Sequence, residues 1–236
     1  MNSSNGIKKE LAYVCMPALF CVLGYALLWL TLQPVWSLAT AAAGTLVSKD
    51  APNFDSQLTS IFDPEAERPQ VQQADNGTEG FISGRDIEFP DSGSQYGQIY
   101  CERIGLDAPV YWYDSDEILS YGVGQSLASM LPGFGSAIIL SAHNTTYFKC
   151  LQDIEVGDTI QFETNYCDYE YQVTNVQVYD ENELWTLLSE KGLQEEEELI
   201  MYTCYPFHAI SGRKTQRLTV FAKRTSGLDV KWRYLD

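Results

Sequence analysis

Residues 198–223 read ELIMYTCYPFHAISGRKTQRLTVFAK and contain the two strands on which the prediction of the fold rests. The apolar run Leu199–Cys204 is soon broken by a proline, which indicates a strand that ends at Cys204. A second run, Arg217–Ala222, resumes the pattern after a polar loop. If the two runs pair as antiparallel strands, Cys204 and Arg217 lie at the same end of neighbouring strands. A guanidinium beside a thiol favours the thiolate, so Cys204 is a candidate nucleophile.

The chain has only two histidines, His143 and His208, so any imidazole chemistry must use one of them. His143 follows the apolar run Ser136–Ala142, where a strand gives way to a polar turn. His208 lies four residues after Cys204 and would need a tight loop to reach it, so it ranks second. A thiolate, an imidazole and a guanidinium together suit acyl transfer from a peptide bond. Spacing alone leaves open the alternative of a buried cysteine, a structural histidine and a surface arginine.

Short runs of β-branched and aromatic residues between turn signals fill the chain from about residue 97 onward. They predict strands at Gln98–Ile104, Ala108–Tyr113, Ser136–Ala142, Asp158–Glu163, Tyr169–Tyr179, Glu198–Cys204 and Arg217–Lys223. Helical turns are predicted near Glu117–Tyr121, Tyr147–Ile154 and Glu183–Ser189. About seven or eight strands with few helices indicate a mainly β fold, either a barrel or a sandwich. Closure into a barrel would remove exposed strand edges.

The N-terminal region predicts a membrane anchor. Residues 11–32 carry no charge and, at about 1.5 Å per residue, are long enough to span a hydrocarbon core of about 30 Å. Lys8 and Lys9 precede them and the chain beyond them is acidic, so residues 1–10 are expected in the cytoplasm and the rest outside the cell membrane. Two alternatives are a cleaved signal peptide that ends near Ala39-Thr40-Ala41 and a buried core helix.

Residues 33–96 are predicted to form a polar linker or loosely packed arm, which connects the anchor to a body at residues 97–236. The segment is rich in Asp, Glu, Gln, Ser, Pro, Asn and Gly, and its apolar residues show no sustained period. Within the body, the run Glu195–Glu198 is expected to be solvated, because four like charges disfavour burial.

The counts of charged residues and cysteines exclude several classes of protein. Lys and Arg number 15 against 32 Asp and Glu, and the net charge of −17 disfavours binding to nucleic acid. Two histidines are too few for a three-histidine zinc site, and the cysteines match no zinc spacing. No metal ligand or cofactor is assigned, and dependence on calcium stays open. Two of the six cysteines lie in the predicted anchor. If Cys204 is a nucleophile, at least one of Cys101, Cys150 and Cys167 is unpaired.

The motifs around these candidates resemble those of sortases, the cysteine transpeptidases of Gram-positive cell surfaces. YTCYPF at residues 202–207, followed by Arg217, is similar to the Thr-Cys…Arg signature of the family. Upstream motifs are similar to the family's opening strands, its histidine segment and its next turn, in the same order: YGQI at 96–99, IGLDAPVY at 104–111, LPG at 131–133, IILSAHN at 138–144 and VGD at 156–158. The resemblance covers about residues 96–225, and YPF after the cysteine most resembles class D.

This resemblance implies a closed β-barrel of the sortase type and a role for each candidate residue. Cys204 would attack the threonine carbonyl of a sorting signal of the Leu-Pro-x-Thr-Gly/Ala type. His143 would act first as general acid and then as base, and Arg217 would stabilise the oxyanion or orient the substrate. Thr203 would support the nucleophile. An amine of a peptidoglycan precursor or of a pilin lysine would resolve the thioacyl intermediate, and no cofactor is implied.

Three alternatives to this function stay open in the sequence. A hydrolytic cysteine peptidase could use the same residues with water as acceptor, because acceptor choice depends on groove shape and water exclusion. A pilin-polymerising class C sortase is disfavoured, because Asp63-Pro64 is followed by Glu65 and not by the aromatic residue of the class C lid. The third alternative is a non-catalytic barrel that binds peptides or cell wall.

Overall fold

The computed structural model describes residues 22–24, 59–72, 80–192, 194, 196–208 and 214–231. The chain divides into two compact units, Met1–Pro52 and Asn53–Asp236. In the first unit only residues 22–24 are described, and they are helical. The anchor predicted at residues 11–32 therefore lies almost entirely outside the described residues and stays a prediction. Within the described part of the chain, no helix is both long enough and apolar enough to span a membrane.

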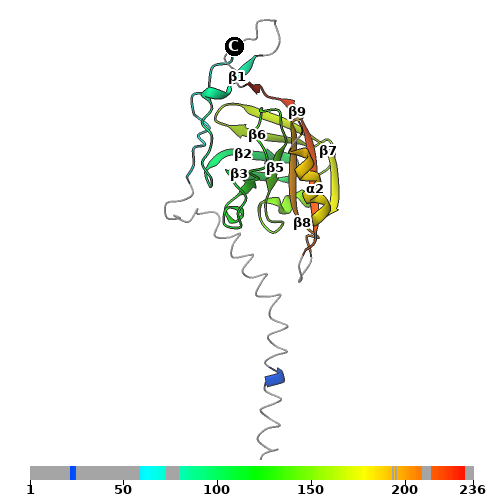
Figure 1. Ribbon diagram of the computed structural model, residues 1–236. Coiled ribbons are helices and arrows are strands. Elements are labelled where there is room, and N and C mark those ends of the chain that lie inside the picture. The colour runs from blue at the N-terminus through cyan, green and yellow to red at the C-terminus, as the bar shows by residue number, and fades with distance from the viewer. Residues whose placement is uncertain are drawn as a thin grey trace, which may run out of the picture. The chain divides into compact units, whose positions relative to one another are not determined.

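Eight strands of the second unit close into a barrel (Figure 1). They follow one another around it in the order β2-β3-β4-β5-β8-β9-β7-β6. Their bounds are β2 (Gln95–Cys101), β3 (Leu106–Trp112), β4 (Val123–Gln125), β5 (Ile138–Ser141), β6 (Thr159–Thr164), β7 (Asp168–Asp180), β8 (Glu198–Tyr205) and β9 (Gln216–Ser226). The prediction of a mainly β fold with a closed barrel is confirmed, and every strand of this barrel except β4 corresponds to a predicted one.

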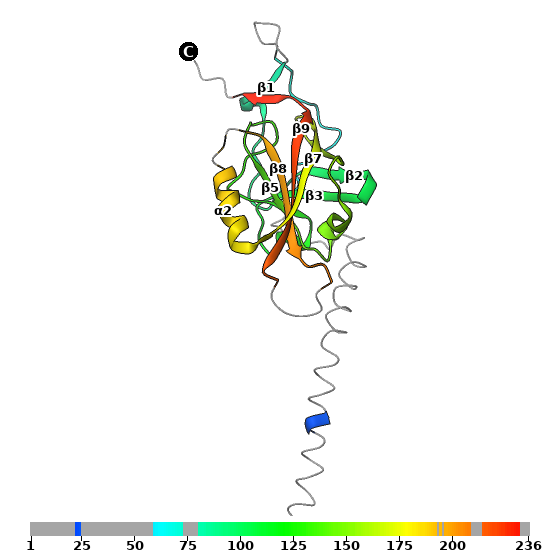
Figure 2. The same ribbon diagram turned by 90° about the vertical axis from the view of Figure 1, so that its right-hand side faces the viewer.

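Side chains that alternate along the strands form two apolar clusters, one inside the barrel and one on its outer face. Along β8, Met201 belongs to the inner cluster and Tyr202 to the outer one. Helix α2 (Glu181–Lys191) packs Leu184 and Leu188 against the outer cluster (Figure 2). Strands β5, β8 and β9 are thus buried on both faces, which is why they read as nearly unbroken apolar runs in the sequence.

Short helices occur where the sequence predicts helical turns. Helix α2 is capped by Asp180, whose side chain accepts the main-chain N–H of Asn182 at 3.1 Å. The positive charge of Lys191 in the last turn interacts favourably with the helix dipole at the C-terminus. The 3-10 helices are η1 (Gly84–Asp86), η2 (Glu102–Ile104), η3 (Ile118–Ser120) and η4 (Tyr147–Asp153), of which η3 and η4 cover predicted positions.

Strand β4 is absent from the sequence prediction, because its residues Val-Gly-Gln include only one β-branched side chain. Close packing requires its glycine, since a Cβ at Gly124 would lie 2.7 Å from the Cα of Asp114. β4 pairs in parallel with β3 and antiparallel with β5. This short strand therefore joins the two halves of the sheet that carry β3 and β5.

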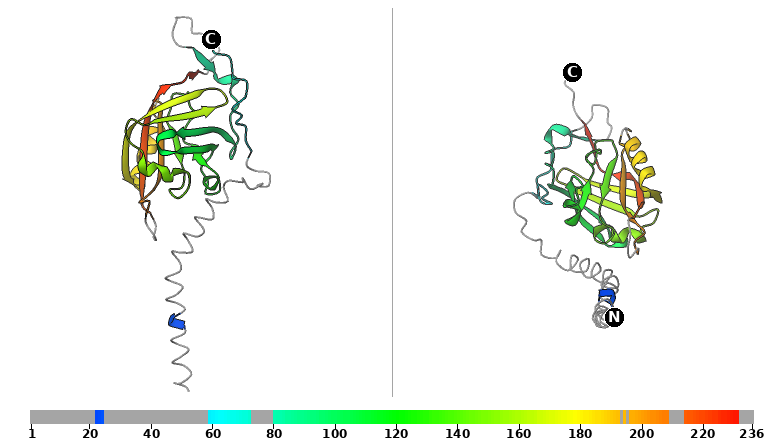
Figure 3. Two further views of the ribbon diagram at one scale, coloured as in Figure 1. Left: turned by 180° about the vertical axis from the view of Figure 1, so that it is seen from behind. Right: turned by 60° about the horizontal axis from the view of Figure 1, so that its bottom comes forward.

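Part of the segment predicted as a loose arm packs on the barrel, which corrects the prediction for those residues. Phe81–Ser83 form strand β1, which pairs in parallel with β10 (Asp229–Lys231). The side chain of Ile82 is fully buried, and the main-chain N–H of Ile61 donates to the carbonyl of Gln95 at 3.0 Å. The segment with residues 59–72 runs beside the barrel in cyan in Figure 3. Its contacting apolar residues are too widely spaced to produce a period, so the sequence gives no sign of this packing.

The prediction that Glu195–Glu198 are solvated is wrong for the last two of these glutamates, and Glu195 lies outside the described residues. Glu196 is exposed, but the side chain of Glu197 is only 5% exposed and Glu198 is buried. The two buried carboxylates each have a cation: Arg224 lies 3.2 Å from Glu197, and Lys191 lies 2.8 Å from Glu198. Each cation keeps its carboxylate from being buried as an uncompensated charge.

Glu197 also connects the loop before β5 to the start of β8. Its Oε2 accepts the main-chain N–H groups of Gly133 and Gly135 at 3.1 and 3.2 Å. Its Oε1 accepts the hydroxyl of Tyr171 at 2.7 Å, inside the barrel. Because Arg224 donates to the same carboxylate, four donors from three parts of the fold converge on one buried side chain.

Replacing Glu197 with alanine is expected to lower the free energy of unfolding by about 3 kcal/mol, because it leaves a half-buried cation and a buried hydroxyl without their partner. Arg224 keeps its ion pair with Asp229, which limits the loss. Glu196→Ala is the matched control, because the ion pair of Glu196 with Lys223 is exposed to solvent and should contribute little. Urea unfolding of both variants measures the difference, and equal midpoints would contradict the role of Glu197.

Candidate active site

The strand register brings the three predicted catalytic residues to one end of three neighbouring strands. β8 and β9 are antiparallel, as predicted, and Cys204 lies directly opposite Arg217. β5 and β8 are parallel, with Ser141 opposite Tyr202. His143 and Cys204 are each two residues further along the chain from this pair. Cys204 therefore lies between the segment that carries His143 and the strand that carries Arg217.

Cys204 is half-buried near the end of β8. Strand alternation places it on the same outer face of the barrel as Tyr202, the face on which α2 packs. The preceding residue, Thr203, is buried, and its hydroxyl donates to the main-chain carbonyl of Ala142 at 2.7 Å. This hydrogen bond fixes the nucleophile's strand to the residue just before His143.

Two of the other thiols are poor candidates for a nucleophile. All four cysteines in the described part of the chain, Cys101, Cys150, Cys167 and Cys204, are free, so no disulfide joins them. Burial raises the pKa of Cys101, and it raises the pKa of Cys150 to about 11. A thiol with such a pKa stays protonated at neutral pH and is a poor nucleophile. The described residues also contain no group of three or more His, Cys, Asp and Glu that could hold a metal ion.

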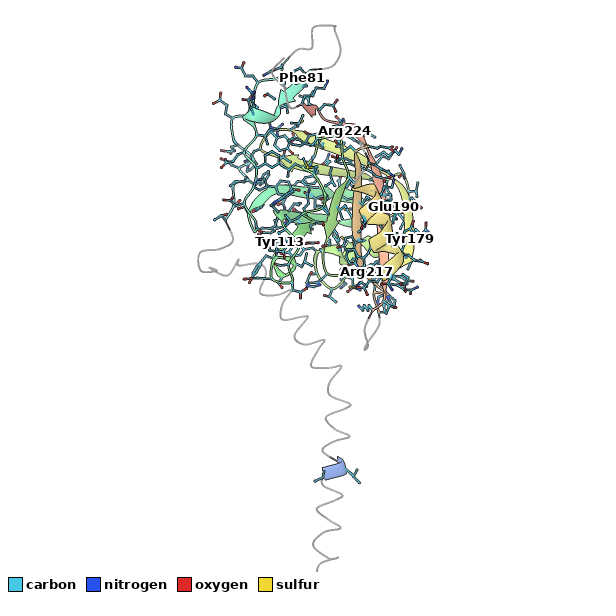
Figure 4. The ribbon with its side chains drawn as sticks, in the orientation of Figure 1. Phe81, Tyr113, Tyr179, Glu190, Arg217 and Arg224 are labelled. Atoms are coloured by element: carbon cyan, nitrogen blue, oxygen red, sulfur yellow. The ribbon has the colours of Figure 1, made fainter. Side chains whose placement is uncertain are left out.

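Arg217 lies at this end of the barrel (Figure 4). Several hydrogen bonds hold its guanidinium there. Its Nη1 donates to the main-chain carbonyls of Lys214 and Gln216 at 2.8 and 2.9 Å. Its Nη2 donates to Oε1 of Glu181, the first residue of α2, at 2.9 Å. These bonds use three of the five N–H donors of a guanidinium and fix the orientation of its plane.

His143 lies in the turn after β5 and is half-buried. The main-chain N–H groups of Thr146 and Phe148 donate to its carbonyl at 3.3 and 3.2 Å, so the turn folds back on the histidine. His208 is exposed and follows the end of β8. Residues 209–213, which come next in the chain, lie outside the described residues. Because β5 and β8 are parallel neighbours, the turn that carries His143 lies next to the end of β8.

Asn144 and Glu181 contact the predicted residues but are not identified in the sequence. Asn144 is buried, and its Nδ2 donates to the main-chain carbonyl of Cys204 at 2.6 Å. Glu181 forms the ion pair with Arg217. An asparagine after a strand is typical of a turn, and an acidic residue in the first turn of a helix is common for reasons of helix stability alone. Neither pattern therefore indicates a site.

Tyr202, a buried tyrosine, lies two residues before Cys204 on the same face of the barrel. Burial raises the pKa of Tyr202 to about 12, and the charge of Asp114 adds to the rise. Burial also raises the pKa of Asp114. The ring of Trp185, from α2, meets the ring of Tyr202 edge-on at 5.6 Å between centroids, and Trp185 remains 45% exposed. An accessible aromatic surface therefore borders the candidate site.

Comparison with known proteins agrees with this fold. The family model described as Sortase domain matches residues 99–225, which is more than half of the chain. The chain belongs to the sortase family. Sortases are cysteine transpeptidases, so this protein is an enzyme of that kind.

The named relatives are sortases of classes D and C. Sortase D of Bacillus subtilis (strain 168) is 25% identical over 161 residues, which are 68% of this chain and 79% of the relative. The structure of a sortase D5 transpeptidase from Clostridium perfringens matches the fold at a TM-score of 0.51 and 20% identity, over 58% of this chain and 83% of the other. A sortase C from Clostridium perfringens, solved with the C-terminal cell wall sorting motif, is 27% identical at a TM-score of 0.50, over 58% and 73%.

Proposed function

We propose that this sortase cleaves a sorting signal of the Leu-Pro-x-Thr-Gly/Ala type and transfers the new threonine carboxyl to an amine at the cell surface. Cys204 is the nucleophile, His143 the general acid and base, and Arg217 the residue that stabilises the oxyanion. The observation that carries this proposal is the strand register, which sets Cys204 opposite Arg217 and beside the segment of His143. The substrate class is supported by the sortase C of Clostridium perfringens solved with a cell wall sorting motif.

The proposed reaction has two acyl-transfer steps. The thiolate of Cys204 attacks the threonine carbonyl, and the peptide C–N bond breaks as His143 gives a proton to the leaving amine. The product is a thioester between the enzyme and the threonine. An incoming amine then gives a proton to His143, attacks the thioester and releases the thiolate. Both steps pass through an oxyanion, to which the remaining N–H donors of Arg217 can bind.

Thr203 supports this reaction by fixing the cysteine strand to Ala142, as its buried hydroxyl bond indicates. The acceptor that fits an enzyme at the outer surface is an amine of a peptidoglycan precursor, with a pilin lysine as the second candidate.

We further propose that residues 11–32 anchor the enzyme in the cell membrane with the barrel outside. This proposal rests on the 22 uncharged residues and on the lysines that precede them. Recovery of the full chain in the soluble fraction of cells would contradict it.

Intact-mass measurement of the acyl enzyme tests the proposed activity. The full-length protein in detergent is mixed with peptides that contain Leu-Pro-x-Thr-Gly or Leu-Pro-x-Thr-Ala, and the acceptor is triglycine, a lysine peptide or hydroxylamine. We expect the enzyme to gain the mass of the threonine-terminated fragment on Cys204. We also expect the amine to form a new amide with that fragment.

The products separate the proposal from its alternatives. A free threonine carboxylate in the presence of every amine would indicate a hydrolytic peptidase, because water alone then resolves the thioester. Preference for the lysine peptide over triglycine would indicate a pilin-polymerising enzyme. Binding of the peptides without any cleavage or mass gain would indicate a non-catalytic barrel, and the proposed activity would be wrong.

A further inference from the structure

Asn144, the residue after His143, is bonded to two other segments of the candidate site. The residue is only 6% exposed. Its Nδ2 donates to the main-chain carbonyl of Cys204 at 2.6 Å and to that of Pro206 at 3.4 Å. Its Oδ1 accepts from the ammonium of Lys214 at 3.2 Å. The Nδ2 and Oδ1 atoms of this buried amide are thus both hydrogen-bonded. Removal of the amide would leave polar groups of the site without a partner.

The bond from Asn144 continues the pairing of β5 with β8 beyond the last backbone partners of the two strands. Two side-chain bonds hold the segments together past that point. One runs from the Thr203 hydroxyl to the carbonyl of Ala142, and the other from the Asn144 amide to the carbonyl of Cys204. His143 lies between Ala142 and Asn144 in the chain. Its backbone is therefore fixed on both sides to the strand that carries the nucleophile.

Lys214 extends this connection to the arginine. Its ammonium binds Asn144, and its main-chain carbonyl accepts Nη1 of Arg217 at 2.8 Å. Glu181 holds the Nη2 of the same guanidinium at 2.9 Å. A continuous set of contacts therefore runs from the turn that carries His143 to the guanidinium of Arg217.

We infer that Asn144 is a positioning residue of the transpeptidation: its amide sets the placement of His143 relative to Cys204 and, through Lys214, that of Arg217. The inference rests on the catalytic roles proposed above for these three residues. Asn144 itself makes and breaks no bond with the substrate. Displacement of a catalytic group by about 1 Å can lower a rate by about 100-fold. Loss of the amide should therefore act on kcat rather than on KM.

The test compares Asn144→Ala with Asn165→Ala in the full-length protein. Asn165 is the matched control: in the turn between β6 and β7, its Oδ1 accepts the main-chain N–H of Asp63 at 2.8 Å and its Nδ2 donates to the carbonyl of Ile61. Turnover of a Leu-Pro-x-Thr-Ala peptide with hydroxylamine is measured together with thermal unfolding. We expect kcat to fall by about 10- to 100-fold in Asn144→Ala and to be unchanged in Asn165→Ala. KM should change by less than about threefold.

A second variant, Asn144→Asp, separates the two contacts of the amide. The carboxylate has the same size and still accepts from Lys214, but it cannot donate to the carbonyl of Cys204. It is expected to lose at least as much kcat as Asn144→Ala. Wild-type kcat in either Asn144 variant would overturn the inference. So would an equal loss of kcat in Asn165→Ala at the same loss of thermal stability, because the effect would then be structural.

Failure of the inference and failure of the proposed function give different results. If Cys204→Ala keeps full activity, the proposed catalytic roles are wrong whatever the Asn144 variants do. If Cys204→Ala is inactive and Asn144→Ala is as active as the wild type, only the positioning role is wrong. If neither Asn144 variant folds while Asn165→Ala does, Asn144 serves the fold and not the reaction, and the inference is also wrong.

Discussion

The Cys204→Ala variant is expected to lose transpeptidase activity, with kcat/KM lower by about 10⁴-fold or more, because the thioester cannot form without the thiol. Cys204 is half-buried at the end of a strand, so the smaller side chain should leave the barrel folded. The measurement is release of the C-terminal fragment of the sorting peptide, combined with the intact mass of the enzyme after incubation. The variant should release no fragment and gain no mass.

Cys150→Ala is the matched control for this loss. It removes the same atoms from a thiol that donates to the carbonyl of Tyr147 at 3.3 Å and whose pKa burial raises to about 11. Such a thiol is protonated at neutral pH, so the control should keep its activity within about twofold. An inactive Cys150→Ala that remains folded, or an active Cys204→Ala, would show that the wrong cysteine has been assigned.

The placement of Cys204 opposite Arg217 is predictable from the sequence, because the two strands are consecutive in the chain and a proline marks where the first one ends. The placement of His143 beside Cys204 is not predictable in this way. It depends on the parallel pairing of β5 with β8, and β6, β7 and α2 intervene between those strands in the chain. A local sequence pattern does not predict such a pairing, so the prediction of His143 depends on the resemblance to sortases and on the comparison with His208.

The features that the sequence does not predict depend on contacts between distant residues. Glu197 belongs to a run of glutamates that is typical of a solvated surface, and its burial depends on the positions of Arg224, the Tyr171 hydroxyl and two glycine N–H groups. The sequence around Asn144 is typical of a turn. The positioning role proposed for Asn144 depends on the carbonyl of Cys204, which lies 60 residues away in the chain. Burial of a polar residue follows from its partners, whereas periodicity reports only where apolar residues lie.

The His143→Gln variant is expected to lower kcat for the sorting peptide by about 10²- to 10⁴-fold, because the amine would leave without a proton. Glutamine keeps a polar side chain of similar length, which favours retention of the fold. His208→Gln makes the same chemical change at an exposed position beyond the end of β8 and should keep wild-type kcat. A loss in His208→Gln with an active His143→Gln would reverse the assignment of the two histidines.

A thioester substrate distinguishes proton transfer from a structural role of His143. A thiolate leaving group has a pKa of about 8.5 and needs no proton to depart, whereas an amine does. If His143 is the general acid, the defect of His143→Gln in acylation should be large with the peptide amide and small with a peptide thioester of the same sequence. If His143 only maintains the shape of the site, the acylation rate should fall equally with both substrates, because both must reach Cys204 in the same orientation. Single-turnover mass measurement of the acyl enzyme gives the two rates, and equal defects would remove His143 from the proposed proton transfer.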